Sequence, residues 1–121
     1  MKPSVYIETS IISYLTARPS NDLRAMENQC ATSEWWETQR PNYSTFVSDL
    51  VISEASRGNP KAAQRRLDVI TDMPLLQISH EVRALALALI DNHALPQKAE
   101  ADAYHVAIAV VNGIGNLTTW N

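Results

Sequence analysis

The stretch Val5-Tyr6-Ile7-Glu8-Thr9-Ser10 is the best starting point for the fold class. An apolar run ends there on a carboxylate, and two residues with hydroxyl groups follow it. The β-branched and aromatic residues over positions 4–7 predict a short buried strand. Thr9 or Ser10 can cap a helix that begins directly after this strand. A strand that passes at once into a helix is typical of proteins in which strands and helices alternate.

The rest of the chain continues this alternation. Hydrophobic patterns predict three further strands, over residues 43–47, 75–78 and 116–120. Helices are predicted between them, with Asn21 or Asp22, Ser48 or Asp49, and Ser79 as capping residues. The predicted helices cover about 22–39, 48–57, 60–70, 81–92 and 98–111. This order predicts an α/β protein of three α/β/α layers with a parallel sheet of four short strands, formed by one domain over residues 1–121.

Composition excludes several classes of protein. The 121 residues are 45% hydrophobic and 19% charged, which is typical of a globular domain. A net charge of −3 argues against a protein that coats nucleic acid through bulk positive charge. The single cysteine, Cys30, excludes an internal disulfide framework and a thiolate-rich metal site. No signal peptide and no apolar run of membrane-spanning length are visible, so a cytoplasmic protein is expected.

Three carboxylates stand out because each lies in a largely apolar segment. Glu8 follows the first strand, and Glu54 and Asp102 lie in predicted helices. Burial of an isolated carboxylate costs several kcal/mol or more unless a cation or hydrogen bonds compensate, and no Lys or Arg beside them in sequence is an obvious partner. Ligands gather at the carboxyl ends of parallel strands, where Glu8 and Asn121 are both expected. If the three acids converge, a divalent cation is the simplest counter-charge, and their oxygens suit Mg²⁺ or Mn²⁺.

Four segments in order then carry a family resemblance. They are Val5 to Ser10, Ser48 to Glu54, Lys98 to Ala107, and Asn116 to Asn121. In these segments the chain resembles PIN-domain ribonucleases of the kind found as VapC-like toxins in toxin–antitoxin pairs. The family has acidic residues at the corresponding places and a sheet of up to five strands. Two departures are visible: Glu8 stands where the family usually has Asp, and the chain ends at Asn121 where the family continues, which predicts a chain shortened at its C-terminus.

The resemblance implies a site and an activity. Glu8, Glu54 and Asp102 would bind Mg²⁺ or Mn²⁺, with Asn121 contributing directly or through water. The hydroxyls of Thr9 and Ser10 would orient the attacking water or a ligand carboxylate. The implied reaction is metal-dependent hydrolysis of RNA phosphodiester bonds without a covalent enzyme intermediate. The implied partners are an RNA substrate, a cognate antitoxin protein and a second copy of the chain in a homodimer.

Other residues have two interpretations at this point. His105 lies three residues after Asp102 on the same helix face, but imidazole is a poor ligand for Mg²⁺, so a structural role is favoured. Arg57, Lys61 and Arg65, with Arg66 beside them, form the basic cluster; they could contact phosphates or form a solvated helix face. Two other functions also stay open, an inactive PIN-like binding module and a different metal-dependent phosphohydrolase.

Overall fold

A parallel sheet of four strands forms the centre of the molecule. The computed structural model describes residues 1–92 and 99–121. The strands are β1 (Ser4–Ile7), β2 (Ser44–Ser48), β3 (Leu75–Leu76) and β4 (Asn116–Thr118). They lie in the order β3-β2-β1-β4, and each neighbouring pair is parallel. This confirms the predicted α/β architecture with a parallel sheet.

Two strands are shorter than the sequence predicts. β3 pairs only with Val47 and Ser48 at the edge of the sheet, so it stops at Leu76 instead of Ile78. β4 stops at Thr118, because the backbone N–H of Trp120 donates to the Ser10 hydroxyl at 2.9 Å instead of to a strand neighbour. The chain thus turns away from the sheet at the point where the expected site lies.

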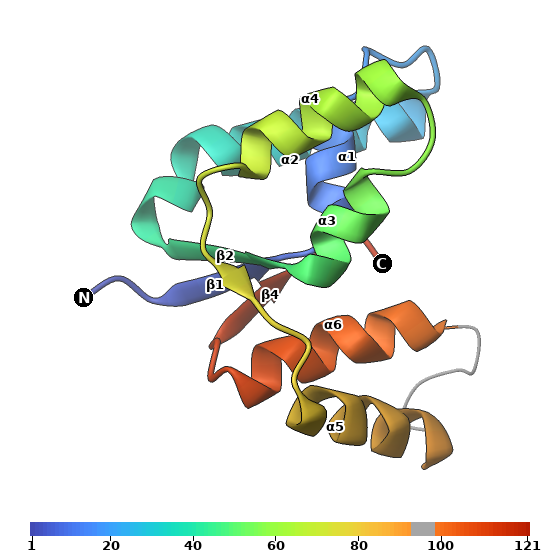
Figure 1. Cartoon of the computed structure of the whole chain (residues 1–121). Coiled ribbons are helices and arrows are strands. Elements are labelled where there is room, and N and C mark those ends of the chain that lie inside the picture. The colour runs from blue at the N-terminus through green and yellow to red at the C-terminus, as the bar shows by residue number, and fades with distance from the viewer. Residues whose placement is uncertain (93–98) are drawn as a thin grey trace.

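Helices cover both faces of the sheet, which gives the three layers visible in Figure 1. One face carries α1 (Thr9–Thr16), α2 (Leu23–Thr38), α3 (Asp49–Ala55) and α4 (Pro60–Ile70), and the other carries α5 (His80–Asp91) and α6 (Glu100–Val111). A short 3₁₀ turn, η1 (Arg40–Asn42), joins α2 to β2. In the described part of the chain, every helix is too short or too polar to span a bilayer.

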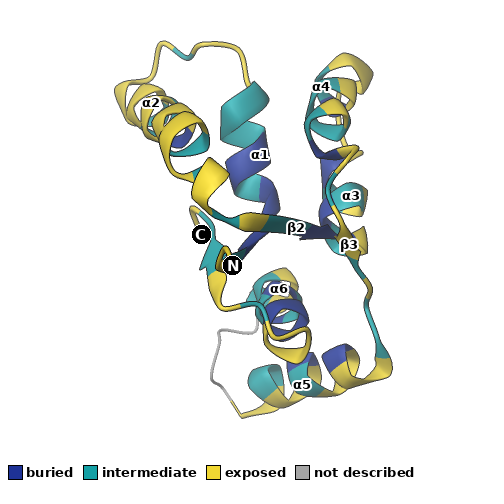
Figure 2. Ribbon diagram, turned by 90° about the vertical axis from the view of Figure 1, so that its left-hand side faces the viewer, coloured by how far each residue is buried: buried dark blue, intermediate teal, exposed yellow. Residues whose placement is uncertain are grey.

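The core lies where these helices meet the sheet. The side chains with the largest volume and no exposure are Tyr6, Ile7, Ile12 and Ile108, from β1, α1 and α6. Figure 2 shows the buried residues in dark blue on α1 and α6. Because both faces of β1 are covered, its residues Val5 to Ile7 are all buried, as is usual for a central parallel strand.

Three predicted caps are present, and a fourth is different. Asp22, Ser48 and Ser79 each accept the backbone N–H three residues ahead, at 2.9, 3.2 and 3.2 Å. The prediction that Thr9 or Ser10 caps the first helix is wrong. Glu8 occupies the N-cap position without a side-chain cap bond, and α1 already begins at Thr9. The Thr9 and Ser10 hydroxyls donate to carboxylates instead, which are stronger acceptors than neutral groups.

The end of α6 sets the position of β4. The N–H of Gly113 donates to the carbonyl of Val110, and the N–H of Ile114 donates to that of Ala109. Gly113 has a φ of +68°, a left-handed conformation that glycine adopts without steric cost. This is the Schellman arrangement of a helix C-terminus. It directs the chain from α6 into β4, so that β4 lies beside β1. The predicted start of this helix at Lys98 falls outside the described residues.

Candidate metal centre

Glu8 lies at the point where the sheet changes its winding direction. β2 and β4 flank β1 on opposite sides, and ligands of parallel α/β proteins bind at the carboxyl end of such a junction. The backbone N–H of Glu8 donates to the carbonyl of Thr118 at 3.1 Å, which joins β1 to β4 at this end. The Glu8 side chain is buried, and its Oε1 accepts hydrogen bonds from the hydroxyls of Ser10 and, at 2.6 Å, Thr119. Its Oε2 stays available to the site.

Glu54 reaches the same place from the α3 side of the sheet. The Ser48 cap starts α3 directly after β2, so that Glu54 falls in the last turn of this short helix. Its side chain is 19% exposed, which leaves it accessible from solvent. Glu54 Oε1 accepts the Thr9 hydroxyl at 2.5 Å and lies 2.8 Å from Nε2 of His105.

The third contribution comes from α6 on the opposite face. Asp102 lies in its first turn and is partly buried, and His105 follows one turn later with 2% exposure. Both line a cavity of about 150 Å³. The full lining is Glu8, Asp102, His105, Val106, Leu117, Thr119 and Asn121. The structure therefore brings Asp102 and Asn121 to the cavity that Glu8 lines.

A chain of hydrogen bonds fixes the His105 ring. Its Nδ1 lies 2.5 Å from the Tyr6 hydroxyl, which lies 2.8 Å from the Ser48 hydroxyl. Burial raises the pKa of Tyr6 well above its usual range, and the nearby charges of Glu54 and Glu8 act in the same direction, whereas the Ser48 hydrogen bond opposes it. Tyr6 is therefore a neutral hydroxyl that can donate one hydrogen bond and accept others.

The donor set suits a divalent cation. Glu8, Glu54 and His105 each offer one ligand atom, and these atoms all lie within 4.8 Å of one another. Among the residues that the structure describes, the basic group at ion-pair distance from these glutamates is His105, 2.8 Å from Glu54 and 3.8 Å from Glu8. In the described ranges no Lys or Arg lies at ion-pair distance from these two carboxylates, so two negative groups share one histidine, and a bound cation would supply further counter-charge.

The basic cluster lies apart from this cavity. Arg57 and Lys61 are exposed, and neither lines the space beside Glu8. Arg65 donates through Nε to the carbonyl of Thr16 at 3.3 Å, which ties α4 to the end of α1. Arg66 donates to the carbonyls of Ala55 and Arg57 at the end of α3. Two of the four cations thus bind backbone carbonyls at helix ends, and RNA contact by Arg57, Lys61 and Arg65 stays a prediction.

The sequence interpretation missed several groups that hold the site together. Tyr6 was expected only as a core residue of a strand and Ser48 only as a helix cap, and no sequence pattern links them to His105. Thr119 carried a weak signal, because it lies between a predicted strand end and Asn121. His105 carried a clearer one, its spacing from Asp102, and it lies at hydrogen-bond distance from Tyr6 and Glu54. The structural role favoured for it stays a prediction.

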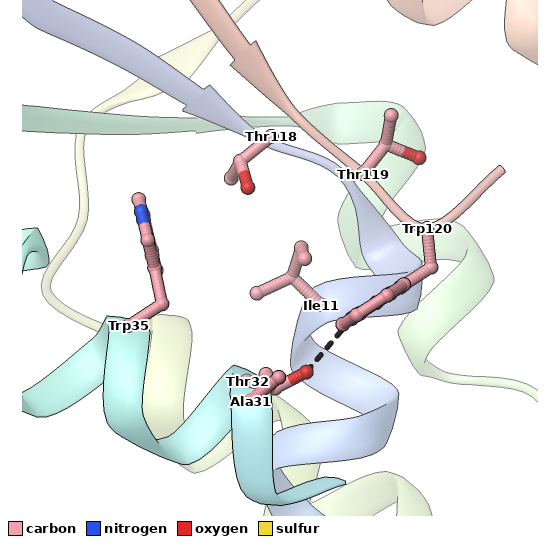
Figure 3. A pocket seen from close by; sticks show the side chains of 7 residues that line it. All are labelled: Ile11, Ala31, Thr32, Trp35, Thr118, Thr119 and Trp120. Carbon is pink, nitrogen blue, oxygen red and sulfur yellow. Dashed lines mark hydrogen bonds between the residues drawn. The ribbon is translucent and has the colours of Figure 1, made fainter. Parts of the chain in front are cut away.

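A second cavity, of about 290 Å³, adjoins the site on the α2 side (Figure 3). Thr119 lines both cavities. Trp120 lines the second one and donates its indole N–H to the Thr32 hydroxyl at 2.7 Å. The Tyr14 and Trp120 rings also pack edge to face, 5.9 Å apart. These contacts anchor the segment after β4 and thereby keep Thr119 and Asn121 beside Glu8.

The molecule is an α/β protein with a parallel sheet and with acidic groups at the carboxyl end of its central strand. The model of the PIN domain matches residues 5–119, and the chain therefore belongs to the PIN-domain family. Among solved structures, VapC20 of Mycobacterium tuberculosis, described as a sarcin-ricin loop cleaving toxin, superposes with a TM-score of 0.75. The two chains are 18% identical, and the match covers 98% of this chain and 90% of VapC20, which establishes a shared fold. No curated protein matches the chain.

Proposed function

We propose that this protein is a divalent-metal-dependent endoribonuclease and the toxin of a toxin–antitoxin pair. The observation that carries the proposal is that Glu8, Asp102 and Asn121 line one cavity, with Glu54 joined to it through His105, in a chain of the PIN family. The structural relative VapC20 is described as a sarcin-ricin loop cleaving toxin, which supports the choice of a nuclease toxin.

Each side chain has a distinct role in this proposal. Glu8, Glu54 and Asp102 hold Mg²⁺ or Mn²⁺, and the amide of Asn121 adds a neutral oxygen. Ser10 and Thr119 occupy Oε1 of Glu8, so that Oε2 faces the site. Thr9 orients Glu54 in the same way. Bound divalent cations supply Lewis-acid stabilisation of the charge that develops on the phosphoryl oxygens and promote ionisation of an attacking water.

The same proposal covers the partners of the protein. Its substrate is RNA, approached from the exposed side of Glu54, with Arg57 and Lys61 available for phosphate contacts beyond the cavity. Its protein partners are a cognate antitoxin that suppresses cleavage and a second copy of the chain in a homodimer. The proposed site of action is the cytoplasm, where such an RNA substrate and an antitoxin would both be present. Size-exclusion chromatography with light scattering measures the dimer directly.

The deciding experiment incubates the purified chain with total RNA in Mg²⁺, in Mn²⁺ and in excess chelator, and maps new RNA ends by sequencing. We expect discrete ends in the presence of metal and none with chelator. Single-stranded DNA of the sequence around a mapped site is the control, and it should stay intact. RNA that is retained but never cut would contradict the nuclease and indicate a binding module. Cleavage of DNA at the same rate would indicate a less selective phosphohydrolase.

A further inference from the structure

His105 occupies a place in the centre that the carboxylates alone do not explain. His105 belongs to α6, on the face of the sheet opposite α1 and α3. The residue is 2% exposed. Its Nε2 is directed at both glutamates, 2.8 Å from Oε1 of Glu54 and 3.8 Å from Oε2 of Glu8. A histidine with a purely structural role would need one acceptor for its Nε2. Here Nε2 lies near the carboxylates of both Glu8 and Glu54, and one oxygen of each carboxylate lies within 4.8 Å of the other.

These separations suit atoms that share one ion. Ligand atoms about 2.1 Å from a metal lie roughly 3 Å from one another. The observed distances of 2.8 and 3.8 Å bracket this value, and the three ligand atoms all lie within 4.8 Å. Small side-chain adjustments are therefore enough for Glu8, Glu54 and His105 to contact a single cation.

The far side of the ring is built to support such a contact. A histidine that ligates a metal through one nitrogen normally donates its other N–H to a fixed acceptor. Nδ1 of His105 has such an acceptor in the Tyr6 hydroxyl at 2.5 Å, and Tyr6 can in turn donate to Ser48 at 2.8 Å. Hydroxyls rotate to donate in either direction, so the same chain also supports the tautomer that donates from Nε2 to Glu54.

We propose that His105 is a metal ligand through Nε2, so that the centre is a mixed carboxylate–imidazole site that prefers first-row transition ions such as Mn²⁺ to Mg²⁺. Imidazole nitrogen is a better ligand for transition ions than for Mg²⁺, which prefers oxygen and water. The inference rests on the metal centre of the proposed function and extends it, because it assigns a nitrogen ligand and a metal preference to a site otherwise made of oxygens.

The test uses Mn²⁺ as the probe and needs no RNA. Pulsed electron paramagnetic resonance of the chain with one equivalent of Mn²⁺ should show coupling to an imidazole nitrogen. His105→Gln should abolish that coupling, and His80→Gln, which alters an exposed histidine at the start of α5, should leave it intact. By calorimetry, His105→Gln should weaken Mn²⁺ binding by about 10- to 100-fold and Mg²⁺ binding far less. The ratio of the two affinities is therefore the decisive readout.

Two results would overturn the inference. One is the absence of nitrogen coupling in the native chain. The other is an equal loss of Mn²⁺ and Mg²⁺ affinity in His105→Gln, which would make His105 a positioning residue for Glu54. If circular dichroism shows that His105→Gln is unfolded, Tyr6→Phe replaces it. This variant keeps the ring packing, and it should retain the coupling while it lowers the Mn²⁺ to Mg²⁺ affinity ratio several-fold.

The outcome is separable from that of the proposed function. RNA cleavage in the absence of nitrogen coupling overturns ligation by His105 and leaves the nuclease in place. Nitrogen coupling without RNA cleavage supports ligation and contradicts the nuclease.

Discussion

At the scale of single residues, the negative charge of Glu8 and Glu54 dominates the chemistry of the site. Glu8 and Glu54 lie close to His105, and hydroxyls of Thr9, Ser10 and Thr119 satisfy one oxygen of each carboxylate. Hydroxyl donors orient a carboxylate but do not neutralise it. The residual charge is what we expect to attract a cation, and it makes the acids the most sensitive positions for function.

Asp102→Asn and Glu54→Gln should each lower RNA cleavage by roughly 100-fold or more, because a neutral group of the same shape removes negative charge that holds the divalent cation on which cleavage depends. Rates measured on an RNA with a mapped cleavage site check this. Glu100→Gln is the matched control, since Glu100 is exposed in the first turn of the same helix, and it should cleave at the native rate. Native cleavage by Asp102→Asn would remove that residue from the mechanism.

Tyr6 should make the fold sensitive to alkali. Its folded-state pKa is raised above the usual 10.0, so the native state keeps a proton that the unfolded chain loses above that pH. This contribution to stability is present below about pH 10 and is lost as the pH rises further. Tyr6→Phe should lower the free energy of unfolding at pH 7 by about 1–3 kcal/mol, because Ser48 and His105 lose a partner.

Urea unfolding between about pH 7 and pH 11.5 measures both effects. The decline of stability at high pH should be shallower in Tyr6→Phe than in the native chain. Tyr43→Phe, at the residue directly before β2, is the control for the removal of one tyrosine hydroxyl. Parallel declines in the native chain and Tyr6→Phe would show that Tyr6 does not control the alkaline transition.

At the scale of elements, the helix caps determine where functional residues project. Ser48 both starts α3 and holds Tyr6, so one hydroxyl links the position of Glu54 to that of the His105 ring. Ser79 caps α5. This helix packs against the side of α6 that points away from the sheet. Ser79 does not line the cavity beside Glu8. Its hydrogen bond to the N–H of Val82 should therefore affect the stability of the fold but not metal binding.

Ser79→Ala should lower the free energy of unfolding by about 0.5–2 kcal/mol, because the N–H of Val82 loses its acceptor. Chemical denaturation checks the value. Ser33→Ala, at an exposed position within α2, is the control and should change stability by less than about 0.5 kcal/mol. Metal affinity should stay at the native level in both variants. A loss of metal affinity in Ser79→Ala would show that α5 influences the site.

At the scale of the whole molecule, the site joins the two helical layers. Glu8 and Glu54 belong to the side of α1 and α3, whereas Asp102 and His105 belong to α6 on the other face. Their meeting depends on how firmly α6 packs against the sheet. Ile108 is the largest fully buried apolar side chain of α6 and belongs to the core cluster.

Ile108→Ala should destabilise the protein by about 2–5 kcal/mol, because it removes buried apolar volume and leaves a cavity. It should also weaken metal binding, since α6 would lose its fixed position relative to Glu8. Val110→Ala, on the same helix but 61% exposed, should be close to neutral for both properties. Calorimetric unfolding and Mn²⁺ titration of the two variants check this. Native metal affinity in a destabilised Ile108→Ala would show that the site tolerates movement of α6.

The sequence by itself determined the elements and the candidate acids. The apolar run Val5 to Ile7, the caps Asp22, Ser48 and Ser79, and the breaks between helices act over a few residues, so local patterns predict them. The alternation of strands and helices then predicted the parallel sheet, which is confirmed. Glu8, Glu54 and Asp102 stood out because charged groups in apolar surroundings need a partner.

Only the tertiary structure decided how these groups meet. Tyr6 and His105 are 99 positions apart, and Thr9 and Glu54 are 45 apart, so their contacts depend on strand order and helix packing rather than on any local pattern. In the structure β3 is also shorter than the sequence predicts. The Thr9 and Ser10 hydroxyls donate to carboxylates instead of capping a helix. A hydroxyl binds the strongest acceptor within its reach, and the fold determines which acceptor that is.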